Sequence, residues 1–226
     1  MIARFMAPAF PPDGFVGSDL ACRRGERIVF EHLDFALAPG GVLLLTGRNG
    51  SGKSSLLRLM AGLTPPLSGI LAWDGDDVAD DPAAHRARLA FVGHADALKP
   101  VLTVAESIAF WAGMRGSGDG DAVEAAVDRF GLGALAATPC RLLSAGQRRR
   151  VSLARLIASP APLWLLDEPL TGLDSEAAAE LLDAIAAHRT AGGRVVLSTH
   201  VPLELAGCTT LSLADFAAPA DADTFA

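Results

Sequence analysis

The chain has 226 residues, a mass of 23.3 kDa and a formal net charge of −7. Half of its residues are apolar and a fifth are charged, which excludes a disordered chain and is enough for one large core. The acidic balance argues against a general nucleic-acid-binding protein, and no apolar run reaches the roughly 18–20 residues that cross a bilayer.

The chain begins with several apolar residues, but three prolines interrupt them. We therefore interpret residues 1–15 as a flexible extension rather than a signal peptide. Strand-like runs over residues 27–30 and 34–37 follow, and a Pro-Gly-Gly turn leads into the apolar run Val42–Leu45. A continuous apolar run of this length is typical of a strand that is covered on both faces of a parallel sheet.

A glycine-rich loop follows this strand and opens a helical pattern. Residues 47–54 fit G-x-x-x-x-G-K-[ST], in which successive backbone N–H groups form a nest for phosphate. Lys53, one of only two lysines, would contact the β- and γ-phosphates, and the hydroxyl of Ser54 would bind Mg²⁺. The expected nucleotide-binding residues of the loop are Gly47, Arg48, Asn49, Gly50, Ser51, Gly52, Lys53, Ser54 and Ser55.

The middle of the chain changes from strand-like to helical patterns. Strand-like runs over residues 69–73 and 88–93 come first. Thr103 and Glu106 then have the spacing of a capping box at the start of a helix. We therefore expect a helical subdomain over about residues 95–146, inserted into an α/β core sheet.

Two carboxylates follow the next buried strand, at residues 163–166. Asp167 and Glu168 are expected at the carboxyl edge of the sheet, where open α/β sheets bind their ligands. Asp167 can hold Mg²⁺ through water, and Glu168 can orient and deprotonate an attacking water. An amphipathic helix over about residues 175–188 and a further apolar strand at residues 195–197 complete the core.

A second candidate anion site precedes the helix that starts after Ser144. This serine can cap the helix, and N–H groups near Gly146 would face a ligand beyond its N-terminus. The same helix carries the only basic run of the chain, residues 148–150. We interpret that run as a solvated helix face.

In their order and spacing these motifs resemble those of ABC ATPases, over about residues 15–213. The resemblance implies a RecA-like P-loop NTPase fold of the ABC nucleotide-binding type, with one ABC ATPase domain at 16–213 and a short tail at 214–226. Asp174 matches the D-loop aspartate, and His200 matches the switch histidine that contacts the γ-phosphate beside the catalytic Lys53 and Glu168. The signature segment, which binds the γ-phosphate held by the partner protomer, would be Leu143, Ser144, Ala145, Gly146 and Gln147.

Two positions depart from the general ABC pattern. His94 stands where these ATPases carry a glutamine, so the candidate Mg²⁺ ligands are Ser54, Asp167 and His94. Arg24 stands where an aromatic residue that stacks on adenine is expected. A guanidinium plane can stack on a base, although a solvated surface charge is an equal alternative.

Finer matches over residues 20–27, 93–94, 142–151 and 161–164 resemble the ATP-binding subunits of the haem exporter for cytochrome c maturation. This resemblance implies an ATPase that uses ATP and Mg²⁺, bound peripherally at the cytoplasmic face of the bacterial inner membrane. Its expected partners are polytopic membrane subunits and, with ATP, a second copy of itself. Neither nucleic acid nor haem is expected to bind this chain directly. The alternatives are an ATPase subunit of another ABC exporter and, less favoured, a soluble ABC protein that acts on DNA or ribosomes or a P-loop kinase.

Overall fold

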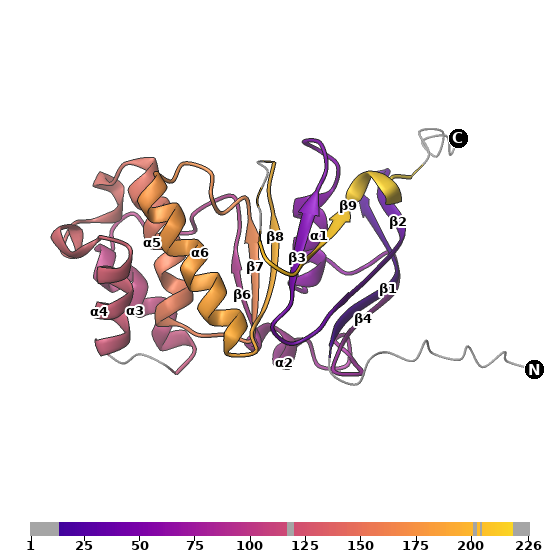
Figure 1. The fold of residues 1–226 in the computed structure, drawn as a ribbon, viewed down its shortest axis with the longest axis horizontal. Helices are drawn as coiled ribbons and strands as arrows, with labels where there is room; N and C mark the ends of the chain where they lie inside the picture. Colours follow the sequence, from indigo (N-terminus) through magenta and orange to yellow (C-terminus); the bar gives the residue numbers. More distant parts are fainter. Residues whose placement is uncertain (1–13, 117–119, 201–202, 204, 219–226) are drawn as a thin grey trace, which may run out of the picture.

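The computed structural model describes residues 14–116, 120–200, 203 and 205–218. In this part of the chain a parallel sheet stands between a group of helices and a smaller antiparallel sheet (Figure 1). The expected α/β fold with a parallel core sheet is confirmed. Within the described residues, no helix combines the length and the apolar character that crossing a membrane would require.

The parallel sheet has the strand order β6-β7-β8-β3-β9. Its strands are β3 (Val42–Thr46), β6 (Leu89–Val92), β7 (Leu163–Asp167), β8 (Arg194–Ser198) and β9 (Cys208–Ser212). The antiparallel sheet has the order β2-β1-β4-β5, with β1 (Phe15–Arg24), β2 (Arg27–Leu37), β4 (Ser68–Trp73) and β5 (Asp76–Asp77). The helices are α1 (Lys53–Met60), α2 (Pro82–Ala87), α3 (Val104–Met114), α4 (Gly120–Arg129), α5 (Ala145–Ala158) and α6 (Ser175–Thr190).

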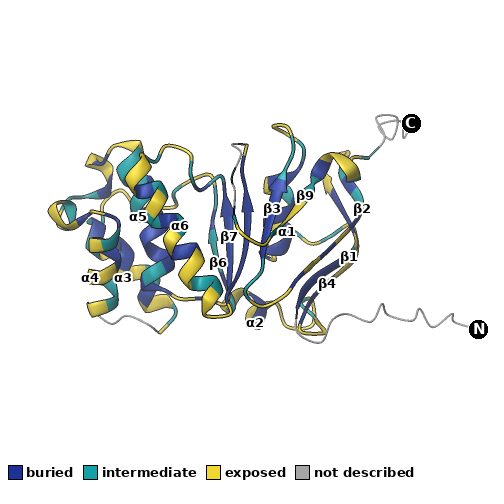
Figure 2. Cartoon of the chain, in the orientation of Figure 1, coloured by how far each residue is buried: buried dark blue, intermediate teal, exposed yellow. Residues whose placement is uncertain are grey.

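Successive apolar residues of the parallel strands point to opposite faces of the sheet. Leu43 and Leu45 of β3 pack into a core shared with α1 and the antiparallel sheet. Val42 and Leu44 pack into a second core with α5 and α6. This two-sided burial, visible as dark strands in Figure 2, is the reason why β3, β7 and β8 carry continuous apolar runs.

The region between residues 95 and 146 contains α3, α4 and two short 3₁₀ turns, Gly133–Leu135 and Cys140–Leu142. The predicted capping box is present at the start of α3. The Thr103 Oγ1 accepts from Glu106 N at 3.2 Å, and the Thr103 N–H donates to Glu106 Oε2 at 2.9 Å. Helices α3 and α4 pack against α5, which ties the helical region to the parallel sheet.

Two ends of the chain differ from the sequence prediction. Phe15, placed in the flexible extension, begins β1 and is fully buried against the Phe35 and Trp73 rings. Strand β1 lacks simple alternation because its pairing shifts around Asp19, which has a φ of 49°. The predicted tail begins inside a 3₁₀ helix, Leu213–Phe216. Residues 1–13 and 219–226 of the two predicted terminal segments lie outside the described residues.

Candidate active site

The glycine-rich loop joins β3 to α1 at the carboxyl edge of the parallel sheet. Gly47 and Gly52 have φ values of 137° and 105°, which side-chain-bearing residues rarely adopt. A Cβ on Gly52 would meet Val29 Cγ1 at 2.5 Å, so there is also no room for a side chain. Gly52 is the N-cap of α1, and no side chain caps this helix. The N–H groups of its first turn can therefore bind a phosphate.

Lys53 lies inside this loop and is only 6% exposed. Its Nζ donates to the carbonyl of Gly47 at 2.8 Å and to the carbonyl of Arg48 at 3.2 Å. These carbonyls offset the cost of burying the ammonium group. The loop thus concentrates one full positive charge at the entrance of α1, in addition to the partial charge of the helix N-terminus.

The two carboxylates lie at the end of β7, as the sequence predicts. Asp167 is buried, and its Oδ1 accepts from the Ser198 hydroxyl at 2.7 Å. The same hydroxyl oxygen accepts from Glu168 N at 2.9 Å, so the last residue of β8 holds both residues. Glu168 has a φ of 47°, and its Oε2 lies 3.2 Å from His200 Nδ1. The structure therefore places the predicted base and the predicted switch histidine side by side.

A pocket of about 520 Å³ brings most of the predicted residues together. Arg27 and Val29 also line the pocket, although the sequence did not predict either of them. Both belong to β2, and only the folding of the antiparallel sheet brings this strand next to the loop. Gly47, Arg48 and Ser51 belong to the same loop but are not lining residues. The pocket is lined by Arg24, Arg27, Val29, Asn49, Gly50, Gly52, Lys53, Ser54, Ser55, His94, Asp167 and Glu168.

The signature segment lies apart from this pocket, on the surface at the start of α5. Ser144 Oγ accepts from Gln147 N at 3.2 Å, and Ser144 N donates to Gln147 Oε1 at 2.8 Å. Ser144 and Ala145 are exposed, Gly146 is half-buried, and Leu143 anchors the segment in the core. None of these residues is among those that line the pocket described above. One chain therefore presents the two predicted anion sites separately.

The predicted D-loop aspartate connects the signature helix to α6. Asp174 caps α6 by accepting from Ala177 N at 2.9 Å, and Arg150 of α5 donates to its other oxygen. The Ala177 amide, followed by the charge of Arg150, lowers the pKa of Asp174. Gly146 also lies close to this loop, because a Cβ on it would meet the Gly172 carbonyl at 2.9 Å. The signature and D-loop segments thus form one connected surface.

The basic run at residues 148–150 is not the solvated helix face that the sequence predicts. Arg149 is only 6% exposed and points into the protein, while Arg148 and Arg150 are half-buried. The Arg148 guanidinium donates to the Leu143 carbonyl at 2.6 Å, and Arg150 pairs with Asp174. A run of three identical residues gave no sequence signal that its middle member is buried.

Comparisons with known proteins agree with this geometry. The model of the ABC transporter family matches residues 30–171. The cytochrome c biogenesis ATP-binding export protein CcmA of Rhodospirillum rubrum is 57% identical over 206 residues, which is 91% of this chain and 88% of the relative. The chain therefore belongs to the ABC transporter family, in the group that includes this relative.

Solved structures show the same fold. An ABC transporter ATP-binding protein from Pyrococcus furiosus has a TM-score of 0.80 at 21% identity, over 91% of this chain and 100% of that chain. A dimeric ATP-binding cassette in a post-hydrolysis state, bound to ADP and Pi, has a TM-score of 0.73 at 24% identity, over 83% and 88%.

Proposed function

We propose that this member of the ABC transporter family is the ATP-hydrolysing subunit of a membrane ABC complex that handles or exports haem in c-type cytochrome biogenesis. The observation that carries the ATPase assignment is the pocket that joins the phosphate loop to Asp167 and Glu168, with His200 beside the latter. The 57% identity to a cytochrome c biogenesis ATP-binding export protein supports the biological role. The resemblance of the chain to haem-exporter ATPases indicates that the substrate is haem, which the membrane subunits would move.

In this proposal ATP binds with its phosphates on the glycine-rich loop. The N–H groups at the start of α1 would hold the phosphate oxygens, and Lys53 would turn from its loop carbonyls to the β- and γ-phosphates. The adenine base would lie toward Arg24 and Arg27, which line the pocket on the β1–β2 side. Arg24 would stack on the adenine ring.

The residues around the phosphate site fit a Mg²⁺ ion that arrives with ATP. Mg²⁺ is held in proteins by one or two carboxylates together with phosphate oxygens and water. Ser54 and Asp167 offer one hydroxyl and one carboxylate, and His94 stands at the same wall. In the described residues no group of three or more His, Cys, Asp or Glu side chains could hold a metal ion. When bound, the ion would neutralise charge that develops on the phosphates.

Hydrolysis in this pocket needs one base, and Glu168 is placed to serve as that base. Its carboxylate would accept a proton from water while the water oxygen bonds to the γ-phosphorus and the bond to the leaving ADP oxygen breaks. His200, 3.2 Å from this carboxylate, would hold it in position and reach the γ-phosphate. The Ser198 hydroxyl accepts a hydrogen bond from the Glu168 N–H and so holds the backbone of Glu168 in place.

Two copies of the chain would complete each ATP site. The pocket supplies Lys53 and Glu168, and the first turn of α5, with Ser144 exposed and Gly146 half-buried, would close the pocket of the second copy. A related cassette that forms a dimer with ADP and Pi supports this arrangement. Because the arrangement is two-fold symmetric, the dimer would hold two ATP molecules head to tail.

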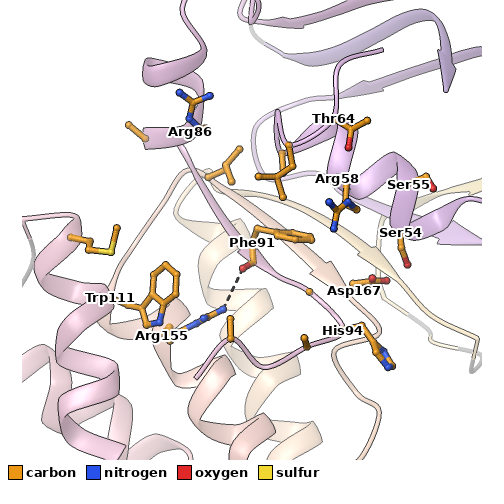
Figure 3. Close-up of a pocket in the computed structure, with 18 of the residues that line it drawn as sticks. Ser54, Ser55, Arg58, Thr64, Arg86, Phe91, His94, Trp111, Arg155 and Asp167 are labelled. Carbon is orange, nitrogen blue, oxygen red and sulfur yellow. Dashed lines mark hydrogen bonds between the residues drawn. The ribbon is translucent and has the colours of Figure 1, made fainter. Parts of the chain in front are cut away.

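The membrane subunits would dock beside His94, from the cytoplasmic face of the inner membrane. A groove of about 1440 Å³ runs there from Ser54 to Trp111 of α3 (Figure 3). Arg58 and Arg86 line it with exposed guanidinium groups, so an acidic and apolar cytoplasmic segment would match its charge.

The segment between β6 and α3 offers a test of this docking site. In this segment Leu98 packs on the core, whereas Val101 is 73% exposed. Val101→Asp should therefore weaken co-purification with the membrane subunits and leave ATP binding intact.

A haem stain of membrane proteins tests the biological role. In a bacterial strain that carries only the Lys53→Ala variant, mature c-type cytochromes should disappear while b-type cytochromes and haem synthesis remain. Because b-type haem is not covalently attached, its persistence separates a maturation defect from a haem shortage. Normal c-type cytochromes in that strain would contradict the haem role and favour the ATPase subunit of another ABC exporter.

A further inference from the structure

The buried Arg149 of the signature helix has no role in the ATP site described so far. Its guanidinium lies beneath the site and meets the carboxyl ends of two parallel strands. The Nη1 atom donates to the Gly93 carbonyl, just after β6, at 2.8 Å. The Nη2 atom donates to the Asp167 and Glu168 carbonyls, at the end of β7, at 2.8 and 2.9 Å. One side chain thus joins α5, β6 and β7 under the phosphate pocket.

The five N–H donors of a guanidinium suit this position. The Nε atom faces the Pro169 carbonyl at 3.4 Å, and Nη1 lies 3.6 Å from Asp96 Oδ1. Burial lowers the pKa of Arg149, and Asp96 raises it in part. A lysine carries a single point of charge and could not meet the carbonyls of two separate strands in this way.

The backbone that Arg149 holds is strained at one residue. Glu168 has a φ of 47°, and a non-glycine residue persists there only where its surroundings fix it. Arg149 binds the carbonyls before, at and after this residue, while Ser198 binds its N–H. The direction of the Glu168 side chain toward His200 depends on this backbone conformation.

We propose that Arg149 is a positioning residue for ATP hydrolysis, which acts by holding the Glu168 backbone in its left-handed conformation and by fixing the signature helix to it. Arg149 is not itself a lining residue of the nucleotide pocket, and its hydrogen bonds reach the backbone carbonyls of Asp167 and Glu168, not the Glu168 carboxylate. The inference rests on the proposed ATPase function and adds a residue to it. Because Arg149 would act through Glu168, its replacement should change the turnover rate rather than the nucleotide affinity.

A double-mutant cycle on the full-length chain, in its membrane complex, tests this proposal. Arg149→Gln should lower kcat about 10–100-fold, as the loss of a supporting partner typically does, while KM for ATP stays within about threefold. Arg149→Lys, which keeps the charge and guards against a folding failure of the first variant, should lower kcat similarly. In a Glu168→Gln background, Arg149→Gln should cause no further loss of single-turnover hydrolysis.

The matched control is Arg194→Gln, because Arg194 is equally buried at the opposite end of β8 and pairs with Asp74. It should lower the melting temperature and leave kcat unchanged. Three outcomes would each overturn the proposal. The first is an unchanged kcat in both Arg149 variants, and the second is a loss of hydrolysis in the Glu168→Gln background as large as in the unsubstituted chain. The third is a rise in KM that accounts for the loss. Failure of the proposed function is distinguishable, since the unsubstituted complex would then not hydrolyse ATP.

Discussion

Two helices begin at candidate anion sites, and their first turns are built differently. The α1 helix starts at a left-handed glycine, Gly52, and no side chain caps it. The α5 helix starts at Ser144, which exchanges two hydrogen bonds with Gln147 in a capping box. Lys53 adds a buried charge at the first site, whereas Ser144 at the second site is exposed.

This difference indicates that the two turns of one chain are suited to bind phosphate in different ways. No side chain caps the first turn of α1, so its N–H groups can bind the phosphates. The turn of α5 is already stabilised by its own residues, so it can stay ordered while exposed. An ordered, exposed turn is suited to a phosphate that another chain holds, which is the arrangement proposed above.

The largest effect should come from the catalytic carboxylate beside the first site. Glu168→Gln should lower kcat about 10²–10⁴-fold, because the amide cannot accept the proton from water. ATP binding and dimerisation should persist, since Glu168 does not belong to the α1 turn. Steady-state ATPase assays and gel filtration with ATP measure both. Glu180→Gln, at a half-buried carboxylate on α6 that pairs with Arg129, serves as a control. Near-normal turnover in Glu168→Gln would refute the base assignment.

A negative charge on α5 should come next. Ser144→Asp retains a good N-cap but places a carboxylate where the partner's γ-phosphate is expected, so turnover should fall on the order of 10²-fold. Ser144→Asn is the matched control, because it caps equally well without the charge. The isolated chain should still bind ATP with normal affinity by fluorescence titration. A loss of affinity in the isolated chain would place Ser144 in its own chain's site.

The caps themselves should differ in what they contribute to stability. Gly52→Ala adds a Cβ to a residue with a φ of 105°, and this Cβ would clash with Val29. The variant should lower the free energy of unfolding by about 1–3 kcal/mol. Ser144→Ala loses only a side-chain cap and should cost about 1 kcal/mol. Gly50→Ala, with a φ of 80° and nothing within 4 Å of the added Cβ, isolates backbone strain from the clash. Urea unfolding curves measure all three, and a costlier Ser144→Ala would reverse the comparison.

The smallest effect concerns the far end of α1, where His85 meets the Met60 carbonyl at 2.8 Å. Burial lowers the pKa of His85 below its ordinary 6.5, so the unfolded chain binds more protons in the window just below pH 6.5. Stability from this group is therefore complete above pH 6.5 and is lost as the pH falls toward the lowered pKa.

Melting temperatures between pH 7.5 and 5.5 test this pH dependence, and His85→Gln should flatten the fall. The exposed His32 gives the opposite sign, because its hydrogen bond to Asp19 raises its pKa. Its contribution is present below pH 6.5 and is lost as the pH rises through that raised value. An unchanged slope in His85→Gln would show that another group governs the acid side.

The sequence predicted those parts of the molecule that depend on local pattern. The phosphate loop, Asp167 and Glu168 follow apolar runs that are typical of buried strands, and the structure places them at one sheet edge. It did not predict β1, whose pairing shifts around Asp19, or β9, whose Thr209 and Thr210 are exposed. The burial of Arg149 depends on backbone carbonyls of two distant strands, and a contact of this kind leaves no mark in a local pattern.

The central claim is that each ATP site combines α1 of one chain with α5 of another, and a mixing experiment tests it most directly. Lys53→Ala and Ser144→Asp chains should each be nearly inactive alone. In an equal mixture, half of the dimers pair one variant with the other, and one of their two sites is intact. The account predicts about a quarter of the unsubstituted ATPase rate in the mixture. No recovery, although pull-down of differently tagged chains shows mixed dimers, would contradict it.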